Sequence, residues 1–318
     1  MSASELALSL LALLPAPAPT PAPITVPAAL AAQNRTIEPS GVVWAEPLER
    51  YLVVSDDTGS SSDGHRPWVF AMSRTGAFDE AAVPILGLEA LNDAEAICKG
   101  PAGTFFLTTS HSPNKKGHTR PERRMLLQLA LRGRALQVIG KVDLTTARSA
   151  TGASLLELAG LDPKGRLDIE ALTFSDGALL VGLKSPLSAR GGAVILRLAE
   201  AAAVLGRGSI PAGALTRTLE LPLEVERDGR PVHQGISDLL ALADGSLIVL
   251  ANSPKGLPHD GGGAMYWLKA GARTPILLQR FRGLKPEGVT LAEGGKGLVL
   301  VFDNDSKPPL WTPWALPR

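Results

Sequence analysis

The 318-residue sequence has a single cysteine and no long hydrophobic run. Cys98 alone excludes an intrachain disulfide framework and a cysteine-rich zinc site. The apolar runs are far shorter than the roughly 18 residues of a membrane-spanning helix, so we expect no membrane span. Lys and Arg number 32 against 31 Asp and Glu, and a net charge of +1 gives no reason to expect a nucleic-acid polymer as partner. Any anion-binding site must therefore be local.

Glycine and proline are abundant, with 33 and 26 residues respectively. Together with 45% hydrophobic and 20% charged residues, this composition is typical of a globular, turn-rich β protein and argues against long helices.

A fivefold internal repeat organises most of the chain. Each copy has a small or acidic residue, then Gly, Ala or Asp, then an apolar strand, and the copies recur about every 62 residues. The copies occupy residues 37–44, 92–99, 168–174, 234–242 and 285–291. Their alignment places Ser40, Glu95, Glu170, Ser237 and Glu287 at one equivalent position.

Further apolar runs follow each copy and are typical of buried strands. The second strands are predicted at 51–57, 105–112, 179–186, 247–254 and 298–305. The third are predicted at 66–73, 123–131, 191–198, 262–269 and 309–316. The fourth are predicted at 82–88, 135–144, 215–223 and 274–281, and residues 24–30 supply the one that the fifth unit lacks.

This pattern predicts an all-β fold, a five-bladed β-propeller over residues 22–318 closed by an N-terminal strand in the last blade. Two long stretches, 145–166 and 199–213, interrupt the repeat, and short helices are expected within them. A six-bladed propeller with a degenerate blade at 145–166 is the alternative architecture.

The N-terminal segment is predicted to be a leader. Residues 4–14 are apolar and 15–23 are rich in Pro and Ala, a layout that resembles a short signal sequence without its basic start. We assign residues 1–21 to a signal-like or disordered leader. A secreted or periplasmic location is expected, with a cytoplasmic one as the alternative.

The aligned repeat position indicates a metal site. The innermost strands of a propeller line its central channel, so three carboxylates and two hydroxyls would form a ring there. Converging carboxylates repel unless protonated or bridged by a cation, and hard oxygen donors suit Ca²⁺. The alternative is that these residues only cap the inner strands. The predicted calcium ligands are Ser40, Glu95, Glu170, Ser237 and Glu287.

The order Ser, Glu, Glu, Ser, Glu over five blades resembles the calcium-activated nucleotidases of the apyrase family. That resemblance implies a calcium ion at the centre of the propeller and a nucleotide substrate. Residues 93–124 also resemble a characteristic stretch of an uncharacterised bacterial propeller family, and this implies the fold rather than an activity.

Polar residues at strand ends and in a basic loop are the candidates for catalysis and substrate binding. A rim aspartate would orient or deprotonate water, while His111 and Lys184 would offset developing charge. Arginines of the basic loop would clamp phosphate oxygens. The catalytic candidates are Asp56, Asp57, Asp93, His111, Lys184 and Asp303. The substrate-binding candidates are Lys115, Arg120, Arg123, Arg124, His233 and Asn252.

These residues favour a calcium-dependent hydrolase of phosphate esters or anhydrides, acting as a monomer on a small anionic ester such as a phosphodiester, phosphotriester or nucleotide. A metal-dependent lactonase or esterase is the first alternative. A non-catalytic ligand- or protein-binding propeller with a structural calcium is the second, and a glycoside hydrolase is the weakest.

Overall fold

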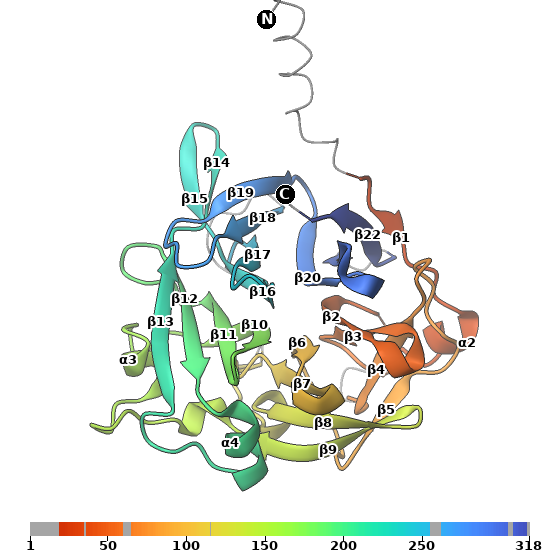
Figure 1. Ribbon diagram of the computed structural model, residues 1–318, viewed down its shortest axis with the longest axis horizontal. Helices are drawn as coiled ribbons and strands as arrows, with labels where there is room; N and C mark the ends of the chain where they lie inside the picture. Colours follow the sequence, from red (N-terminus) through yellow and green to blue (C-terminus); the bar gives the residue numbers. More distant parts are fainter. Residues whose placement is uncertain are drawn as a thin grey trace, which may run out of the picture.

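The computed structural model describes residues 19–34, 36–59, 65–114, 116–254, 262–304 and 308–316. These residues form antiparallel four-stranded blades arranged around a central axis (Figure 1). Blade 1 contains β2 (Pro39–Ala45), β3 (Arg50–Ser55), β4 (Trp68–Met72) and β5 (Val83–Leu86). Blade 2 contains β6 (Ala94–Lys99), β7 (Thr104–Thr109), β8 (Leu126–Arg132) and β9 (Ala135–Val142).

The remaining blades repeat this plan. Blade 3 contains β10 (Asp168–Ser175), β11 (Ala178–Ser185), β12 (Ala193–Leu198) and β13 (Leu215–Leu221). Blade 4 contains β16 (Gly235–Ala241), β17 (Leu247–Asn252), β18 (Gly263–Leu268) and β19 (Ile276–Phe281). Blade 5 contains β20 (Lys285–Leu291), β21 (Gly297–Asp303), β22 (Leu310–Ala315) and β1 (Ala22–Pro23).

The inner strands β2, β6, β10, β16 and β20 surround the axis, and each contacts the next, with β20 contacting β2 (Figure 1). Apolar side chains fill the space between every neighbouring pair of blades, because alternate residues of each strand pack against opposite neighbours. Leu52 and Val54 of β3, for example, pack towards blade 2, whereas Tyr51 and Val53 pack towards blade 5. The predicted all-β propeller fold is therefore confirmed.

Closure of the last blade occurs slightly earlier in the chain than predicted. Strand β1 pairs with β22, so an N-terminal strand does complete blade 5. The segment 24–30, however, is not a strand along its length, because Pro27 lacks the N–H that a ladder needs and the alanine-rich Ala28–Ala31 forms the short helix α2. Ile24 is buried between blades 1 and 5.

Residues 145–166 contain no strand and do not form a sixth blade. They contain part of the 3₁₀ helix η4 (Leu144–Thr146) and the helix α3 (Leu155–Leu158), which a Ser154–Glu157 capping box begins. Within 199–213 lies α4 (Ala201–Arg207), which packs on blade 2. A Cβ at Gly140 of β9 would come within 2.8 Å of the Leu205 backbone, so only glycine allows this close packing.

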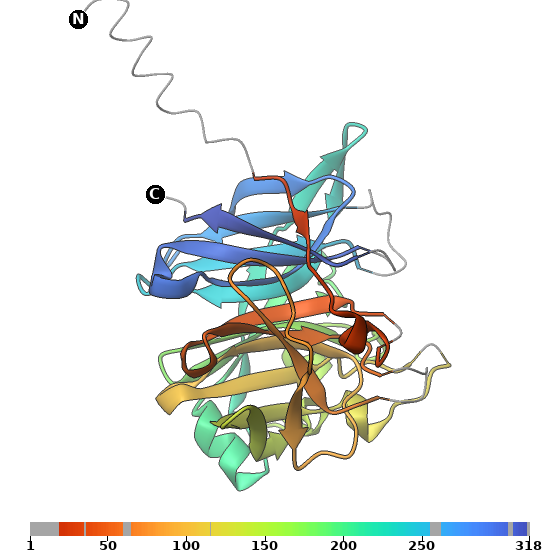
Figure 2. The same ribbon diagram turned by 90° about the vertical axis from the view of Figure 1, so that its right-hand side faces the viewer.

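Two features of the sheets were not predicted. Strands β5 and β9 pair in parallel and join blades 1 and 2 into one eight-stranded sheet. Strands β14 (Glu224–Arg227) and β15 (Arg230–His233) form a separate hairpin that stands out from the body of the propeller (Figure 2).

The other 3₁₀ helices of the described residues are η1 (Glu46–Leu48), η2 (Pro101–Gly103), η3 (Pro121–Arg123) and η5 (Glu293–Gly295). No helix among the described residues is long and apolar enough to cross a membrane.

Candidate functional site

Every inner strand has a β-bulge at the aligned repeat position. In β6, Ala94 pairs with Thr109 and Ala96 with Thr108, which leaves Glu95 as the extra residue. The same skip in the pairing occurs in the other four inner strands. A bulge bends the strand and redirects the extra side chain. The five bulged residues are Ser40, Glu95, Glu170, Ser237 and Glu287, so the alignment of the repeats corresponds to a real structural equivalence.

The small residue that follows the bulge is required by the close approach of the inner strands. A Cβ at Gly288 would lie 2.9 Å from the Gly41 Cα atom, and one at Gly41 would lie 2.9 Å from the Ala96 Cα atom. Larger side chains would push blades 5, 1 and 2 apart. The Gly and Ala of the repeat therefore keep the ring narrow where the carboxylates gather.

Six carboxylates form an acidic centre at this end of the inner strands. Two triads have ligand atoms within 4.8 Å of one another: Asp56, Asp93 and Glu95 form one, and Glu95, Asp168 and Glu170 form the other. Glu287 is linked to the second triad through the ammonium group of Lys184. The acidic centre thus consists of Asp56, Asp93, Glu95, Asp168, Glu170 and Glu287.

Asp168 was not among the predicted site residues, although the sequence carried a signal for it. Asp93 precedes Glu95 by two residues, and Asp168 precedes Glu170 by two. In both blades the two carboxylates of this Asp-x-Glu pattern have ligand atoms within 4.8 Å of each other, so the pattern supplies a second carboxylate beside each ring position.

Burial and mutual repulsion disfavour ionisation of these groups. Burial, reinforced by the charge on Asp93, raises the pKa of Asp56 to about 8. Burial and the nearby Asp56 and Glu170 raise the pKa of Glu95 well above its usual value. Burial also raises the pKa of Glu170 well above its usual value, despite the opposing effect of Lys184. The centre therefore needs protons or added positive charge.

Two buried cations offset part of this charge. The Nζ of Lys184 lies 2.5 Å from an Oε of Glu170 and 3.7 Å from an Oε of Glu287. Burial opposes the charged form, but these two carboxylates hold the pKa of Lys184 well above its usual value. Arg123 forms an ion pair with Asp93. The six carboxylates of the acidic centre thus lie beside two buried cations.

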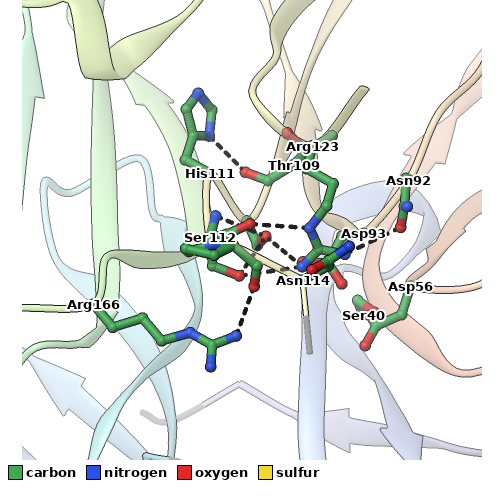
Figure 3. Close-up of polar contacts among 12 residues, drawn as sticks. Ser40, Asp56, Asn92, Asp93, Thr109, His111, Ser112, Asn114, Arg123 and Arg166 are labelled. Carbon is green, nitrogen blue, oxygen red and sulfur yellow. Dashed lines mark hydrogen bonds and ion pairs between the residues drawn. The ribbon is translucent and has the colours of Figure 1, made fainter. Parts of the chain in front are cut away.

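Arg123 is used within the protein rather than held open for a substrate. Figure 3 shows its guanidinium between Asn92, Asp93 and Ser112. It donates to the Asn92 Oδ1 at 3.1 Å and the Ser112 carbonyl at 3.0 Å, and it also contacts the Ser110 hydroxyl. Since these contacts and the Asp93 pair occupy the guanidinium, Arg123 fixes the position of Asp93.

His111 is also engaged by the backbone. Its Nδ1 lies 2.8 Å from the Thr109 carbonyl, and its Nε2 accepts from the Leu144 N–H at 3.2 Å, an arrangement that fits the neutral ring with the proton on Nδ1. Burial lowers the pKa of His111 to about 4. Both ring nitrogens are therefore occupied, and His111 holds the β7–β8 loop against η4.

The predicted hydroxyl and amide groups have mainly local partners. Ser40 donates its hydroxyl to the Asp56 carboxylate and so lies beside the first triad. Ser237 donates instead to the Pro286 carbonyl at 2.8 Å. Asn252 donates to that same carbonyl at 2.9 Å, and its side chain also hydrogen-bonds Glu287.

Most of the other predicted residues have an acidic or basic side chain as a partner. Asp303 pairs with Lys285 at 3.4 Å, and the Asp57 carbonyl accepts from Ser55. The remaining pairs are Arg120 with Glu122 at 3.7 Å, Arg124 with Asp143 at 3.0 Å, and His233 with Glu224 at 2.9 Å on the β14–β15 hairpin. Lys115 lies outside the described residues.

A side pocket of about 580 Å³ lies between the β7–β8 loop and the segment that precedes β10. Leu155, Leu156 and Leu167 give it an apolar part. Arg166, whose guanidinium donates to the Pro113 carbonyl at 2.7 Å, ties the two walls together. Arg124 and Lys164 also line it, so the pocket combines an apolar surface with positive charge. Leu167 directly precedes Asp168, which connects the pocket to the acidic centre along the chain.

A ring of antiparallel blades with clustered, buried carboxylates at its axis defines a β-propeller with a candidate centre for a divalent cation. Residues 38–261 match the model of the Phytase-like family, described as esterase-like activity of phytase. This match spans well over half of the chain, which therefore belongs to the Phytase-like family, and the family description indicates hydrolysis of ester bonds.

Solved structures with a similar fold share little sequence with this chain. A putative gluconolactonase is 12% identical with a TM-score of 0.44, and 96% of this chain and 95% of that chain are covered. A gluconolactonase from Xanthomonas campestris is 15% identical, with a TM-score of 0.38 and coverage of 95% and 97%. A glutaminyl cyclase from Myxococcus xanthus is 12% identical, with a TM-score of 0.45 and coverage of 94% and 96%.

No curated protein sequence matches the chain. The family found is Phytase-like, and the resemblance to calcium-activated nucleotidases has no support from the comparisons.

Proposed function

We propose that this protein is a metal-dependent hydrolase of carboxylic esters or lactones, with a divalent cation bound by the acidic centre. The observation that carries the proposal is Glu95. Its side chain belongs to both carboxylate triads and is only 6% exposed. Within the described part of the chain it has no hydrogen-bonding or ion-pair partner. A buried carboxylate among other carboxylates is stable when a cation bridges them.

The donor set indicates which metal fits. Every side chain of the two triads offers oxygen, with neither histidine nor cysteine among them. Hard oxygen donors suit Ca²⁺. The proposed ligands are Asp56, Asp93 and Glu95. Glu170 and Glu287 are left out because both contact the Lys184 ammonium, and Ser237 because its hydroxyl donates to the carbonyl of Pro286, the residue before Glu287.

Bound at these residues, the cation would polarise the ester oxygen and lower the pKa of an attacking water. The chain supplies the positioning. Asp56 and Asp93 are the more exposed members of the first triad and would face the substrate, while Arg123 fixes Asp93. Asp56, a carboxylate of the same triad, is the candidate to orient the water or accept its proton.

The side pocket would hold the rest of the substrate. Its apolar part suits an acyl chain or ring, and Lys164 and Arg166 suit a negatively charged group. A phosphate ester is the second candidate, favoured by the Phytase-like family match. The contacts weaken that candidate, because Arg123 pairs with Asp93 and Arg124 pairs with Asp143, so neither is an open phosphate clamp.

The test is a panel of p-nitrophenyl carboxylic esters, lactones, phosphomonoesters and phosphodiesters, assayed with Ca²⁺ and with EDTA. We expect ester or lactone turnover that EDTA and Glu95→Gln each reduce by at least about 100-fold. Glu46→Gln is the matched control, because Glu46 is an exposed carboxylate paired with Lys99 in η1, and it should leave turnover unchanged.

Turnover of phosphate esters alone would select the second candidate. Turnover that persists in EDTA would contradict the metal, and no turnover across the panel, together with a Ca²⁺-dependent rise in melting temperature, would favour the binding propeller.

A further inference from the structure

Lys184 is a permanent positive charge inside the ring of bulged residues. It lies at the end of β11, and its side chain is 10% exposed. Its ammonium contacts Glu170 of blade 3 and Glu287 of blade 5, which are two of the five bulged residues. A single lysine therefore joins ring positions contributed by blades on either side of blade 4.

We propose that the Lys184 ammonium takes the place of a metal ion in the half of the ring formed by blades 3, 4 and 5, and that a latent cation site lies beneath it. The inference goes beyond the proposed hydrolase, because it concerns the half of the ring that the hydrolytic cation does not use.

The contacts of the neighbouring groups fit an ammonium better than a metal. An ammonium is satisfied by two or three acceptors, whereas Ca²⁺ takes six to eight oxygen ligands. Ser237 of blade 4, the bulged residue between Glu170 and Glu287 in chain order, turns its hydroxyl to the Pro286 carbonyl instead of the ring. The Ser237 proton is thus directed at a carbonyl of blade 5, and the ammonium has its acceptors in Glu170 and Glu287.

The positive charge of Lys184 would direct a metal ion to the other half of the ring, because it already offsets Glu170 and Glu287. With Lys184 present, the charges of Glu170 and Glu287 are offset from within the chain, whereas Glu95 has no ion-pair partner among the described residues. A metal ion would therefore be held by Asp56, Asp93 and Glu95. Without Lys184, the inner half of the ring would hold two unpaired buried carboxylates and would attract a second cation.

The test counts bound Ca²⁺ per chain by equilibrium dialysis and elemental analysis, and measures melting temperature with and without EDTA. Lys184→Met keeps the length of the side chain and removes its charge. We expect it to bind one Ca²⁺ more than the wild type and to gain a larger rise in melting temperature from Ca²⁺. The measured quantity is the difference in bound Ca²⁺ between Lys184→Met and the wild type. This difference tests the role of Lys184 whatever number of ions the wild type binds, and it does not depend on whether the protein hydrolyses esters.

Two matched variants complete the design. Lys99→Met removes another lysine paired with an acid, Glu46, but this pair is exposed, so the Ca²⁺ count should stay at the wild-type value. Lys184→Met combined with Glu170→Gln restores the charge balance of the wild type and should fold without an additional ion.

Glu287→Gln tests the inference in a protein that keeps Lys184. It should keep the wild-type Ca²⁺ count and bind Ca²⁺ within about twofold of the wild-type affinity, because Glu287 serves the lysine and not the metal. Loss of an ion in Glu287→Gln would overturn the inference. So would an unchanged count in folded Lys184→Met, or a Lys184→Met variant that Ca²⁺ cannot fold although the double variant folds.

Discussion

The carboxyl group of Glu95 belongs to both triads of the acidic centre, and its pKa is raised by burial and by its neighbours. Its position follows from the bulge in β6, which turns the side chain out of the ladder. A group in this state opposes folding unless it carries a proton or contacts a cation. The same carboxyl would therefore destabilise the metal-free protein and serve as a ligand when the proposed cation binds.

Glu95→Gln tests both halves of this statement by thermal unfolding. In EDTA the variant should be at least as stable as the wild type, because one member of the repelling cluster is gone. With saturating Ca²⁺ the wild-type melting temperature should rise and that of the variant should not. An equal rise in both proteins would exclude Glu95 as a ligand.

His111 makes the free energy of unfolding depend on pH, because burial lowers its pKa in the folded protein. Its folded-state pKa of about 4 lies below the usual value of 6.5, so the unfolded chain binds more protons between these pH values. Stability from this residue is fully present above about pH 6.5 and is lost as the pH falls to about 4, by about 3 kcal/mol over the window.

Urea unfolding between pH 4 and 7 measures this effect. His111→Gln should be less stable than the wild type at pH 7 and should lose less stability on acidification. If the two proteins show the same slope with pH, His111 does not titrate as its buried contacts require.

At the scale of elements, the β7–β8 loop owes its shape to Arg123 in the 3₁₀ helix η3. The side chain contacts Asp93 in the acidic centre, Asn92 and the Ser112 carbonyl, and so links the loop to the start of β6. Both side chains of the Arg123–Asp93 pair are largely buried. Removing one partner of such a pair leaves an uncompensated charge.

Arg123→Gln should lower the free energy of unfolding by about 3 to 5 kcal/mol and weaken Ca²⁺ binding, because Asp93 loses its support. Arg120→Gln, three residues earlier in the loop, removes an exposed arginine whose partner Glu122 lies at 3.7 Å, and should change stability by less than about 0.5 kcal/mol. Chemical denaturation of the two variants measures the difference. Comparable losses in both would show that the loop depends on general basic charge.

At the scale of the whole molecule, the ring depends on the fit of blade 5 against blade 1. Strand β1 completes blade 5, and Ile24, directly after it, fills the core between these two blades. The two ends of the described chain thus meet at one seam, and packing at that seam closes the propeller without an open edge.

Ile24→Ala should cost about 2 to 5 kcal/mol, as is usual when a fully buried isoleucine is truncated. Ile276→Ala on the outer strand β19 is the control, since Ile276 is 46% exposed and its loss should cost less than about 0.5 kcal/mol. Equal melting temperatures for the two variants would contradict a seam held by apolar packing.

The strands of the propeller could be predicted because buried strands have a simple period and the repeat supplied five copies of it. The bulged ring residues were found for the same reason. The shift of closure to Ala22–Pro23 depends on Pro27, which breaks a run that is otherwise apolar. Asp168 was missed although its spacing from Glu170 repeats that of Asp93 from Glu95.

Contacts between blades were beyond the reach of sequence. Nothing in the chain order shows that Lys184 reaches Glu287, or that Arg123 and His111 are used up by their own loop. Arg123 and His111 are residue types that often act in catalysis. Only their hydrogen-bonding partners in the structure show that both hold the β7–β8 loop in place. The side pocket likewise forms between two segments that are far apart in the repeat.

The most direct test of the central claim is a crystal of the protein soaked with Mn²⁺ as an anomalous substitute for Ca²⁺. The account predicts an anomalous peak between the carboxylates of Asp56, Asp93 and Glu95, off the axis and away from Lys184. A peak on the axis between Ser237 and Glu287, or no peak at the acidic centre at a saturating Mn²⁺ concentration, would contradict it.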